Sequence, residues 1–318
     1  MNYEEALEFV LKNGVKKPPS RPGQPGTVSW HGLQLRYDLR EGFPLITSRT
    51  IYFKSVVREL LWFLSGSTDI RDLWQMDCHI WDQWQRDNKE YDLGPIYGEQ
   101  WRKWGFRNDR LCAPGSECGT SSVDQLAQVL MGLRESPYSR RHLVSAWNPD
   151  DVPFMALPPC HFCFQFTVEP NEEGNPHWLN IHVMQRSWDL PVGAPYNLAS
   201  YGLLLCLVAH EVGLKPKWLV YSATDAHIYE DQILGVVEQL RRSQQPLPQF
   251  SVNQHIELNL KEMRAEIPDP RIGDVPELNP AHFVANGRAC GPKKHGQQSL
   301  FRILNYNPHP SIEYPVAK

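Results

Sequence analysis

A cysteine and a polar stretch downstream are the parts of this sequence best suited to chemistry. Cys160 stands in Leu157-Pro-Pro-Cys-His161, directly before an expected strand. The flanking residues place the thiol at the mouth of that strand, where it can face a pocket. Nearby arginines would lower the pKa of the thiol and populate the nucleophilic thiolate. A buried structural thiol is the alternative, because free cysteine is among the most buried residue types.

The polar stretch runs from Gln185 to Asn197 and reads Gln-Arg-Ser-Trp-Asp-Leu-Pro-Val-Gly-Ala-Pro-Tyr-Asn. Arg186 and Ser187 suit the capture of an anion. The Asn197 amide offers a donor and an acceptor that match the O4/N3–H edge of uracil, whereas cytosine presents the reverse pattern. The same residue could instead serve as the N-cap of the helix expected over 197–212. The stretch therefore predicts a site for a small ligand such as a nucleotide.

Glu59 is a carboxylate on the apolar side of an expected helix over 53–64, with Val56 and Phe63 on the same side. A carboxylate in such a place is paired, protonated or functional. Two interpretations stay open: a buried ion pair with an arginine, or an acid/base whose pKa is raised by burial.

Three further groups of polar residues are candidates for binding. His227 and Tyr229 stand two apart and share one face if the chain is extended, either as a hydroxyl-binding pair or as polar core residues. Arg140 and Arg141 precede an apolar strand, and Arg21 lies in a loop rich in glycine and proline. Taken alone, these arginines also fit solvated surface positions.

The spacing Cys160-x-x-Cys163 invites a redox or zinc interpretation, which the pattern does not favour. In a strand, residues three apart point to opposite faces. No second Cys/His pair at zinc spacing follows. We therefore expect no metal.

Composition narrows the class of protein. The formal net charge of -4 over 318 residues argues against a broad nucleic-acid surface, so no stable nucleic-acid partner is expected. The start of the chain has no signal-peptide core, and the apolar run near 202–209 is far short of the ~20 residues that span a bilayer. We expect a cytoplasmic protein without membrane attachment, in which most of the seven cysteines are reduced.

The expected elements follow in a mixed order. Strands are predicted over 28–37, 142–147, 162–168, 179–184 and 218–221, and helices over 4–11, 53–64, 197–212 and 232–241. Ser122 and Gln125 resemble a capping box that opens a helix through Leu133, and Gly14 is expected to end the first helix in a left-handed conformation. The order indicates one α+β domain over 1–318 with a mixed sheet, and with surface insertions at 106–120 and 281–298.

Long motifs in the correct order identify a resemblance over nearly the whole chain. They are Phe43-Pro-Leu-Ile-Thr47, Glu59-Leu-Leu-Trp-Phe63, Ile80-Trp-Asp-Gln-Trp84, Leu93-Gly-Pro-Ile-Tyr97-Gly-Glu-Gln-Trp-Arg102, Ser139-Arg-Arg141, Ala156-Leu-Pro-Pro-Cys-His161, the stretch from Gln185 to Asn197, Asp225 to Tyr229, and Tyr306-Asn-Pro-His-Pro310. The chain resembles the folate-dependent thymidylate synthase family, which includes pyrimidine nucleotide hydroxymethylases.

The resemblance implies a homodimer that binds dUMP and 5,10-methylenetetrahydrofolate, and it implies a role for each matching residue. The implied nucleophile is Cys160, with Glu59, Tyr97, His161 and Asp189 as further catalytic residues. The implied dUMP site comprises Arg21, Gln185, Arg186 and Ser187, with Asn197 on uracil, His227 and Tyr229 on the ribose 3′-hydroxyl, and Arg140 and Arg141 donated by the other subunit. The implied folate site comprises Ile80, Trp81, Trp84, Leu157, Asp189, Gly193, Tyr196 and Ala317.

The implied chemistry begins with addition of the thiolate at C6 of uracil, which makes C5 a nucleophile. Two outcomes stay open for the methylene that C5 then takes from folate. Hydride reduces it to dTMP in a synthase, and water adds to give 5-hydroxymethyl-dUMP in a hydroxymethylase. The charged end residue, Lys318, could admit water to the site or keep its charge outside. A non-catalytic nucleotide-binding or redox protein using Cys160 and Cys163 is the alternative from another class.

Overall fold

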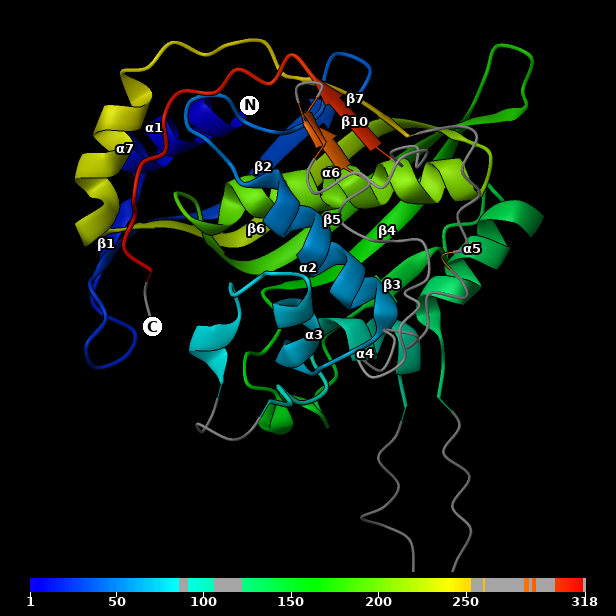
Figure 1. Cartoon of the computed structure of the whole chain (residues 1–318), viewed down its shortest axis with the longest axis horizontal. Helices are drawn as coiled ribbons and strands as arrows, with labels where there is room; N and C mark the ends of the chain where they lie inside the picture. The colour runs from blue at the N-terminus through cyan, green and yellow to red at the C-terminus, as the bar shows by residue number, and fades with distance from the viewer. Residues whose placement is uncertain are drawn as a thin grey trace, which may run out of the picture.

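A mixed six-stranded sheet forms the centre of the molecule (Figure 1). The computed structural model describes residues 1–85, 91–105, 122–252, 260 and 301–316, and the backbone of 283–285 and 288–289. The strands follow the order β1-β2-β6-β5-β4-β3, with β5 and β6 parallel and the other neighbours antiparallel. Their bounds are β1 (Val15–Lys17), β2 (Thr27–Asp38), β3 (Leu143–Ser145), β4 (His161–Pro170), β5 (Pro176–Asp189) and β6 (Lys215–Tyr229).

One face of this sheet is covered by the long helix α6 (Gly193–Glu211), which packs on β5 and β6. Leu203, Leu204 and Leu205 are all buried because this helix is apolar around its whole circumference. Helix α2 (Phe53–Ser65) packs on α6 and on α4 (Tyr97–Lys103). The remaining helices are α1 (Tyr3–Asn13), α3 (Ile70–Gln75), α5 (Gln125–Glu135), α7 (Ile233–Leu240) and the 3-10 turns η1 (Asp82–Trp84), η3 (Val152–Phe154) and η4 (Glu230–Gln232).

A second, small sheet precedes the C-terminal segment. It joins β7 (Gln249–Val252), β10 (Phe301–Leu304), β8 (Phe283–Ala285) and β9 (Arg288–Ala289) in that order. After β10 the chain runs along the edge of the molecule and passes beside α7 (Figure 1). There the Tyr314 hydroxyl donates to the side chain of Gln239. We refer to residues 305–316 as the tail.

The expected α+β class and mixed sheet are confirmed. The helix predicted over 53–64 and the strand over 28–37 match α2 and β2, and Gly66 ends α2 with a left-handed φ of 75°. The strands over 179–184 and 218–221 are much longer than predicted. Their parallel pairing continues through polar residues as far as Asp189 and His227, and these polar ends carry most of the candidate site.

Three local predictions are wrong. Helix α6 begins at Gly193, so Asn197 lies in its second turn and is not its N-cap. Asp124, not Ser122, caps α5, because its carboxylate accepts from the Ala127 N–H at 2.9 Å. Gly14 has an ordinary φ of -67° and is needed for another reason: a Cβ there would lie 2.5 Å from the Val10 carbonyl oxygen.

The insertion predicted at 106–120 lies outside the described residues, and of 281–298 only the two short strands β8 and β9 are described. The single-domain assignment over 1–318 therefore stays a prediction. Within the described part of the chain, none of the helices has both the length and the apolar character needed to cross a bilayer.

Candidate active site

Cys160 and Arg186 meet at the start of β4. The half-buried thiol directly precedes the strand, as predicted, and Nη2 of Arg186 on β5 lies 3.8 Å from its Sγ. Nε and Nη2 of Arg186 donate to the carbonyls of Pro159 and Pro158 at 2.9 and 2.8 Å, and its backbone N–H donates to the Cys160 carbonyl at 2.9 Å. The two prolines thus supply the acceptors that hold the guanidinium beside the thiol.

The net effect of the surroundings is nevertheless to raise the pKa of the Cys160 thiol. Burial raises the pKa of Cys160, against the opposing effects of Arg186, a hydrogen bond from Tyr97 and the charge of Arg21. The prediction that neighbouring arginines would populate the thiolate is therefore wrong in its net direction, because desolvation outweighs them. The arginine is placed to stabilise negative charge on sulfur once the proton has left.

Glu59 lies in α2 and faces inward, half-buried. Its Oε1 accepts a hydrogen bond from Nε1 of Trp81 at 2.8 Å. Burial raises the pKa of Glu59 to about 7, and the Trp81 hydrogen bond acts in the opposite direction. Among the described residues no cation pairs with this carboxylate, so the ion-pair interpretation finds no support there, and the acid/base role stays a prediction.

Tyr97 and His161 connect the thiol to the core. The Tyr97 hydroxyl accepts from the Cys160 N–H at 2.7 Å, and its ring stacks on His161 with centroids 4.2 Å apart. Nδ1 of His161 lies 2.7 Å from the Tyr201 hydroxyl of α6. Burial lowers the pKa of His161 to about 3, so the imidazole is neutral at physiological pH. Sequence reasoning missed Tyr201, because an apolar helix gives no signal for a single hydroxyl turned toward the site.

Asp189 ends β5 and opens the turn into α6. Its Oδ1 accepts from the Val192 N–H at 3.0 Å, and its Oδ2 accepts from Nε2 of Gln232 at 3.2 Å. Burial raises the pKa of Asp189, and both of these hydrogen bonds lower it. Gln232 was missed as well, because nothing in its local sequence marks it.

Asn197 and Gln185 are already partly engaged within the chain. Oδ1 of Asn197 accepts from Nε1 of Trp188 at 3.2 Å, which leaves its amide N–H groups available. Gln185 donates to the Ser187 carbonyl at 2.7 Å and accepts from the Tyr221 hydroxyl. A Cβ built on Gly193 would meet nothing nearer than Asn197 Oδ1 at 3.5 Å. The protein itself therefore does not require glycine there, which leaves room for a ligand beside Asp189.

His227 and Tyr229 share one face of β6, as predicted, with ring centroids 5.0 Å apart and planes at 83°. Nδ1 of His227 lies 3.2 Å from Oδ1 of Asp225, and Asp225 also pairs with Lys17. The hydrogen bond to His227, followed by Lys17, lowers the pKa of Asp225 to about 2. If Nδ1 carries the proton toward this carboxylate, Nε2 is left as an acceptor for a hydroxyl.

The remaining arginines differ in their positions. Burial raises the pKa of both Cys160 and Tyr229, and the charge of the exposed Arg21 acts against this rise at both, so its loop faces the same site. Arg140 and Arg141 are exposed beside β3, and their guanidinium groups have no partner among the described residues. This chain does not itself bring Arg140 and Arg141 to Cys160.

Trp81 forms the inner end of the predicted folate site. It is 5% exposed and packs on Trp62, Phe63 and Tyr97. Trp84, Leu157 and Tyr196 are half-buried, whereas Ile80 is 39% exposed. Ala317 and Lys318 lie outside the described residues.

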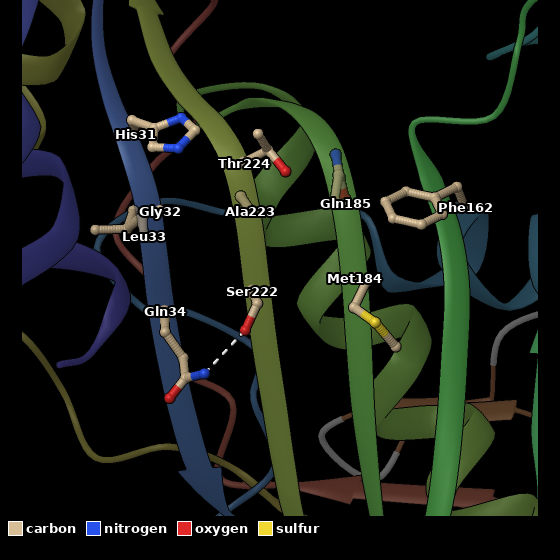
Figure 2. A pocket seen from close by; sticks show the side chains of 10 residues that line it. All are labelled: His31, Gly32, Leu33, Gln34, Phe162, Met184, Gln185, Ser222, Ala223 and Thr224. Atoms are coloured by element: carbon tan, nitrogen blue, oxygen red, sulfur yellow. Dashed lines mark hydrogen bonds between the residues drawn. The ribbon is translucent and has the colours of Figure 1, made fainter.

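A cavity of about 320 Å³ lies elsewhere, between β2, β6, β5 and β4 (Figure 2). Gln185 is the one predicted site residue that it shares. In its lining, Gln34 donates to the Ser222 hydroxyl at 2.9 Å (Figure 2). Nε2 of His182 lies 2.8 Å from the same oxygen. Gln34 and Ser222 alternate with the buried Leu35 and Tyr221, so this polar row lies on the sheet face turned away from α6. Cys160 is not among the residues that line this cavity, and we assign the cavity no chemistry.

The site thus combines a nucleophile beside a cation, a carboxyl that titrates near neutrality, and polar groups at the ends of two parallel strands. In the described ranges, no His, Cys, Asp and Glu side chains cluster so as to hold a metal ion. The family model described as Thymidylate synthase matches residues 1–270 of the chain. Its members are folate-dependent enzymes that act on dUMP. The chain therefore belongs to the thymidylate synthase family.

Proposed function

We propose that the chain is a thymidylate synthase, which converts dUMP to dTMP with 5,10-methylenetetrahydrofolate through a covalent bond between Cys160 and C6 of the pyrimidine. The observation that carries the proposal is the placement of a thiol 3.8 Å from a guanidinium in a site that also contains a carboxyl with a pKa of about 7. Activation of a pyrimidine carbon needs a nucleophile whose negative charge a cation stabilises, and a separate group that transfers protons.

The dUMP site uses the ends of the sheet strands. Arg21, Arg186 and Ser187 bind the phosphate, and Asn197 presents its amide to the uracil edge. His227 and Tyr229 bind the ribose 3′-hydroxyl, supported by the Asp225 contact to Nδ1. Gln185 holds β5 in place behind the nucleotide, through its hydrogen bonds to the Ser187 carbonyl and the Tyr221 hydroxyl.

The proton transfers involve the chain's own groups. The Arg186 guanidinium stabilises the thiolate that forms when the Cys160 proton leaves. When sulfur then bonds to C6, the negative charge passes to the ring as an enolate. Glu59 exchanges protons with the pyrimidine because its pKa lies near the working pH. Tyr97 binds the Cys160 backbone N–H and stacks on neutral His161, which contacts the Tyr201 hydroxyl, so these two residues order the surroundings of the nucleophile.

The folate lies against Trp81, with Ile80, Trp84, Leu157, Asp189, Gly193, Tyr196 and Ala317 as its further contacts. The space left open at Gly193 beside the Asp189 carboxylate fits such a group. When bound, it supplies the methylene carbon and, in a synthase, the hydride. Trp81 supports hydride over water, because this buried ring, held by Glu59, makes an apolar wall that excludes water from the reacting carbon.

The enzyme acts as a cytoplasmic homodimer in this proposal. The sheet face turned away from α6 carries the Gln34–Ser222–His182 row and an open cavity, which a second copy would cover. Arg140 and Arg141 then reach the partner's phosphate site, which gives a use to guanidinium groups that lack a partner among the described residues.

The decisive experiment incubates the protein with dUMP and 5,10-methylenetetrahydrofolate and identifies both products by mass and absorbance. The proposal expects dTMP and an equal amount of dihydrofolate. Formation of 5-hydroxymethyl-dUMP without dihydrofolate contradicts it and assigns the chain to the hydroxymethylases of the family. A chain that leaves dUMP unchanged and shows dithiol–disulfide exchange at Cys160 and Cys163 contradicts both.

A further inference from the structure

A single buried amide, Gln232, reaches three separate parts of the site. It is the last residue of η4, between β6 and α7, and is 1% exposed. Its Nε2 donates to Oδ2 of Asp189 at 3.2 Å and to the Pro315 carbonyl at 3.0 Å. Its Oε1 accepts from the Tyr229 N–H at 3.0 Å. The folate-side carboxylate, the ribose-side turn and the tail therefore meet at one side chain.

The chemistry of this position specifies an amide. A glutamine side chain has two N–H donors and one carbonyl acceptor, and here both donors and the acceptor are used. A carboxylate of the same shape could not donate to Asp189 or to Pro315, and an apolar side chain would leave both acceptors unpaired in a buried place. Unpaired buried polar groups destabilise the fold, so replacing this amide would leave Asp189, Pro315 and the Tyr229 N–H without their shared partner.

The tail is also attached at points that do not involve Gln232. The Tyr314 hydroxyl donates to Gln239 at 2.7 Å, Arg242 donates to the Pro310 carbonyl at 2.6 Å, and the His309 N–H donates to the Thr47 carbonyl at 2.9 Å. The Tyr314 ring also rests on Gly235, where a Cβ would lie 2.5 Å from its Cε1. Loss of the Gln232 amide therefore leaves the tail attached and removes only its link to Asp189 and Tyr229.

We propose that Gln232 is a positioning residue that transmits the placement of the tail to Asp189 and to the Tyr229 turn, so that the folate and ribose sides of the site are set together. The inference rests on the proposed function, because it takes Asp189 as a folate contact and Tyr229 as a ribose contact. Among the described residues, the hydrogen bond of the Pro315 carbonyl to Gln232 links this part of the tail to Tyr229, a predicted dUMP contact, through one side chain.

The test is a double-mutant cycle read by the dissociation constant of dUMP alone, measured calorimetrically. Its four proteins are the unmodified chain, a chain ending at Glu313, Gln232→Leu, and the combination. Deletion of the tail end should weaken dUMP binding about fivefold to tenfold in the unmodified background, as expected for a lost buried hydrogen bond, and less than about twofold in the Gln232→Leu background. Tyr314→Phe is the matched control: it removes a tail hydrogen bond of the same kind that bypasses Asp189, and should change dUMP affinity less than about twofold.

The outcomes separate clearly. The role of Gln232 is overturned if the deletion changes dUMP affinity equally in the two backgrounds, or if it has no effect in the unmodified chain. In either case, the proposed function is unaffected as long as the unmodified chain binds dUMP. Failure of the unmodified chain to bind dUMP overturns the proposed function and this inference with it. If Gln232→Leu does not fold, Gln232→Asn replaces it, because an amide one methylene shorter cannot span the same three partners and should abolish the coupling equally.

Discussion

The two walls of the site are built in different ways. The sheet wall comprises Cys160, Arg186, Ser187, His227 and Tyr229, at the ends of β4, β5 and β6. Backbone pairing sets their spacing: the Arg186 N–H donates to the Cys160 carbonyl, and Ser187 and Asp189 are in register with Asp225 and His227. The outer wall comprises Glu59, Trp81 and Pro315, and single side-chain hydrogen bonds hold it, from Trp81 to Glu59 and from Gln232 to Pro315.

This difference separates two tasks. In the proposed function, the sheet wall carries the groups that act on the nucleotide, whose positions a shared backbone ladder fixes before any ligand binds. In the same proposal, the outer wall carries the groups that meet the second substrate, among them Glu59 with its pKa of about 7. Substitutions in the sheet wall should therefore change affinity unless they remove the nucleophile, whereas substitutions in the outer wall should change pH dependence and turnover.

The largest effect should come from the sheet wall, at Cys160. Cys160→Ala removes the sulfur that bonds to C6 in the proposed mechanism, so turnover of dUMP should fall on the order of 10⁴-fold or more. Cys163→Ala provides the control, because this thiol lies in the strand beyond the site and its pKa is raised to about 11 by burial. Steady-state rates of the two variants decide the point: activity that survives Cys160→Ala but is lost in Cys163→Ala reverses the assignment.

Glu59→Gln should have the next largest effect, lowering kcat roughly 10²- to 10⁴-fold as expected for a general acid/base. The inflection of the rate near pH 7 should vanish with it, since His161 has a pKa of about 3 and cannot supply that inflection. An inflection that persists unchanged in the variant would point to another titrating group.

The same variant should be more stable than the unmodified protein at pH 8. The pKa of Glu59 is raised from its ordinary 4.5 to about 7 in the folded chain, so the folded state holds this proton more tightly than the unfolded state. The free energy of unfolding therefore decreases as the pH rises from about 4.5 to about 7, by up to about 3 kcal/mol. Urea denaturation at pH 5 and pH 8 measures this. Equal stability differences at the two pH values would show that the carboxyl is not desolvated.

Trp81→Phe tests how the outer wall is held. The substitution keeps an aromatic ring and removes the N–H that stabilises the Glu59 carboxylate, so the pKa of Glu59 should rise further and the inflection should move above pH 7. We expect a loss of about tenfold in kcat at neutral pH, as for a lost hydrogen bond to a charged group. A pH–rate profile that does not move would separate Trp81 from the titration of Glu59.

The smallest effect should come from Asp225→Asn, in the sheet wall. This residue acts through Nδ1 of His227, whose position β6 already fixes. The KM for dUMP should rise about threefold to tenfold while kcat stays within about twofold. The preference for dUMP over its 3′-deoxy analogue should fall by the same factor. A fall in kcat with an unchanged preference would place Asp225 outside the ribose site.

The sheet wall was largely predictable from the sequence, and the outer wall was only partly so. Its flanking residues place Cys160 directly before a strand. Local periodicity turns Glu59 inward and puts His227 and Tyr229 on one face of a strand. The structure confirms these placements. The wrong start of α6 at Asn197 has a tertiary cause, because the turn before it is held by Arg49 and Tyr3 through the carbonyls of Pro191 and Leu190.

Several contacts of the outer wall and of the residues behind the thiol join positions far apart in the chain. Gln232 is 43 residues from Asp189 and 83 from Pro315, and His161 is 40 residues from Tyr201. No local sequence pattern predicts such contacts, because each partner is brought close only by the tertiary fold. The direction of the Cys160 pKa depended likewise on burial, which outweighed the arginines that the sequence could reveal.

The release of tritium from [5-³H]dUMP tests most directly the claim that Cys160 activates the pyrimidine carbon. The C5 hydrogen leaves only after the ring has been activated, whichever product follows. The account predicts release that requires 5,10-methylenetetrahydrofolate, that Cys163→Ala retains and that Cys160→Ala abolishes. Release by Cys160→Ala at the rate of the unmodified protein would contradict the account.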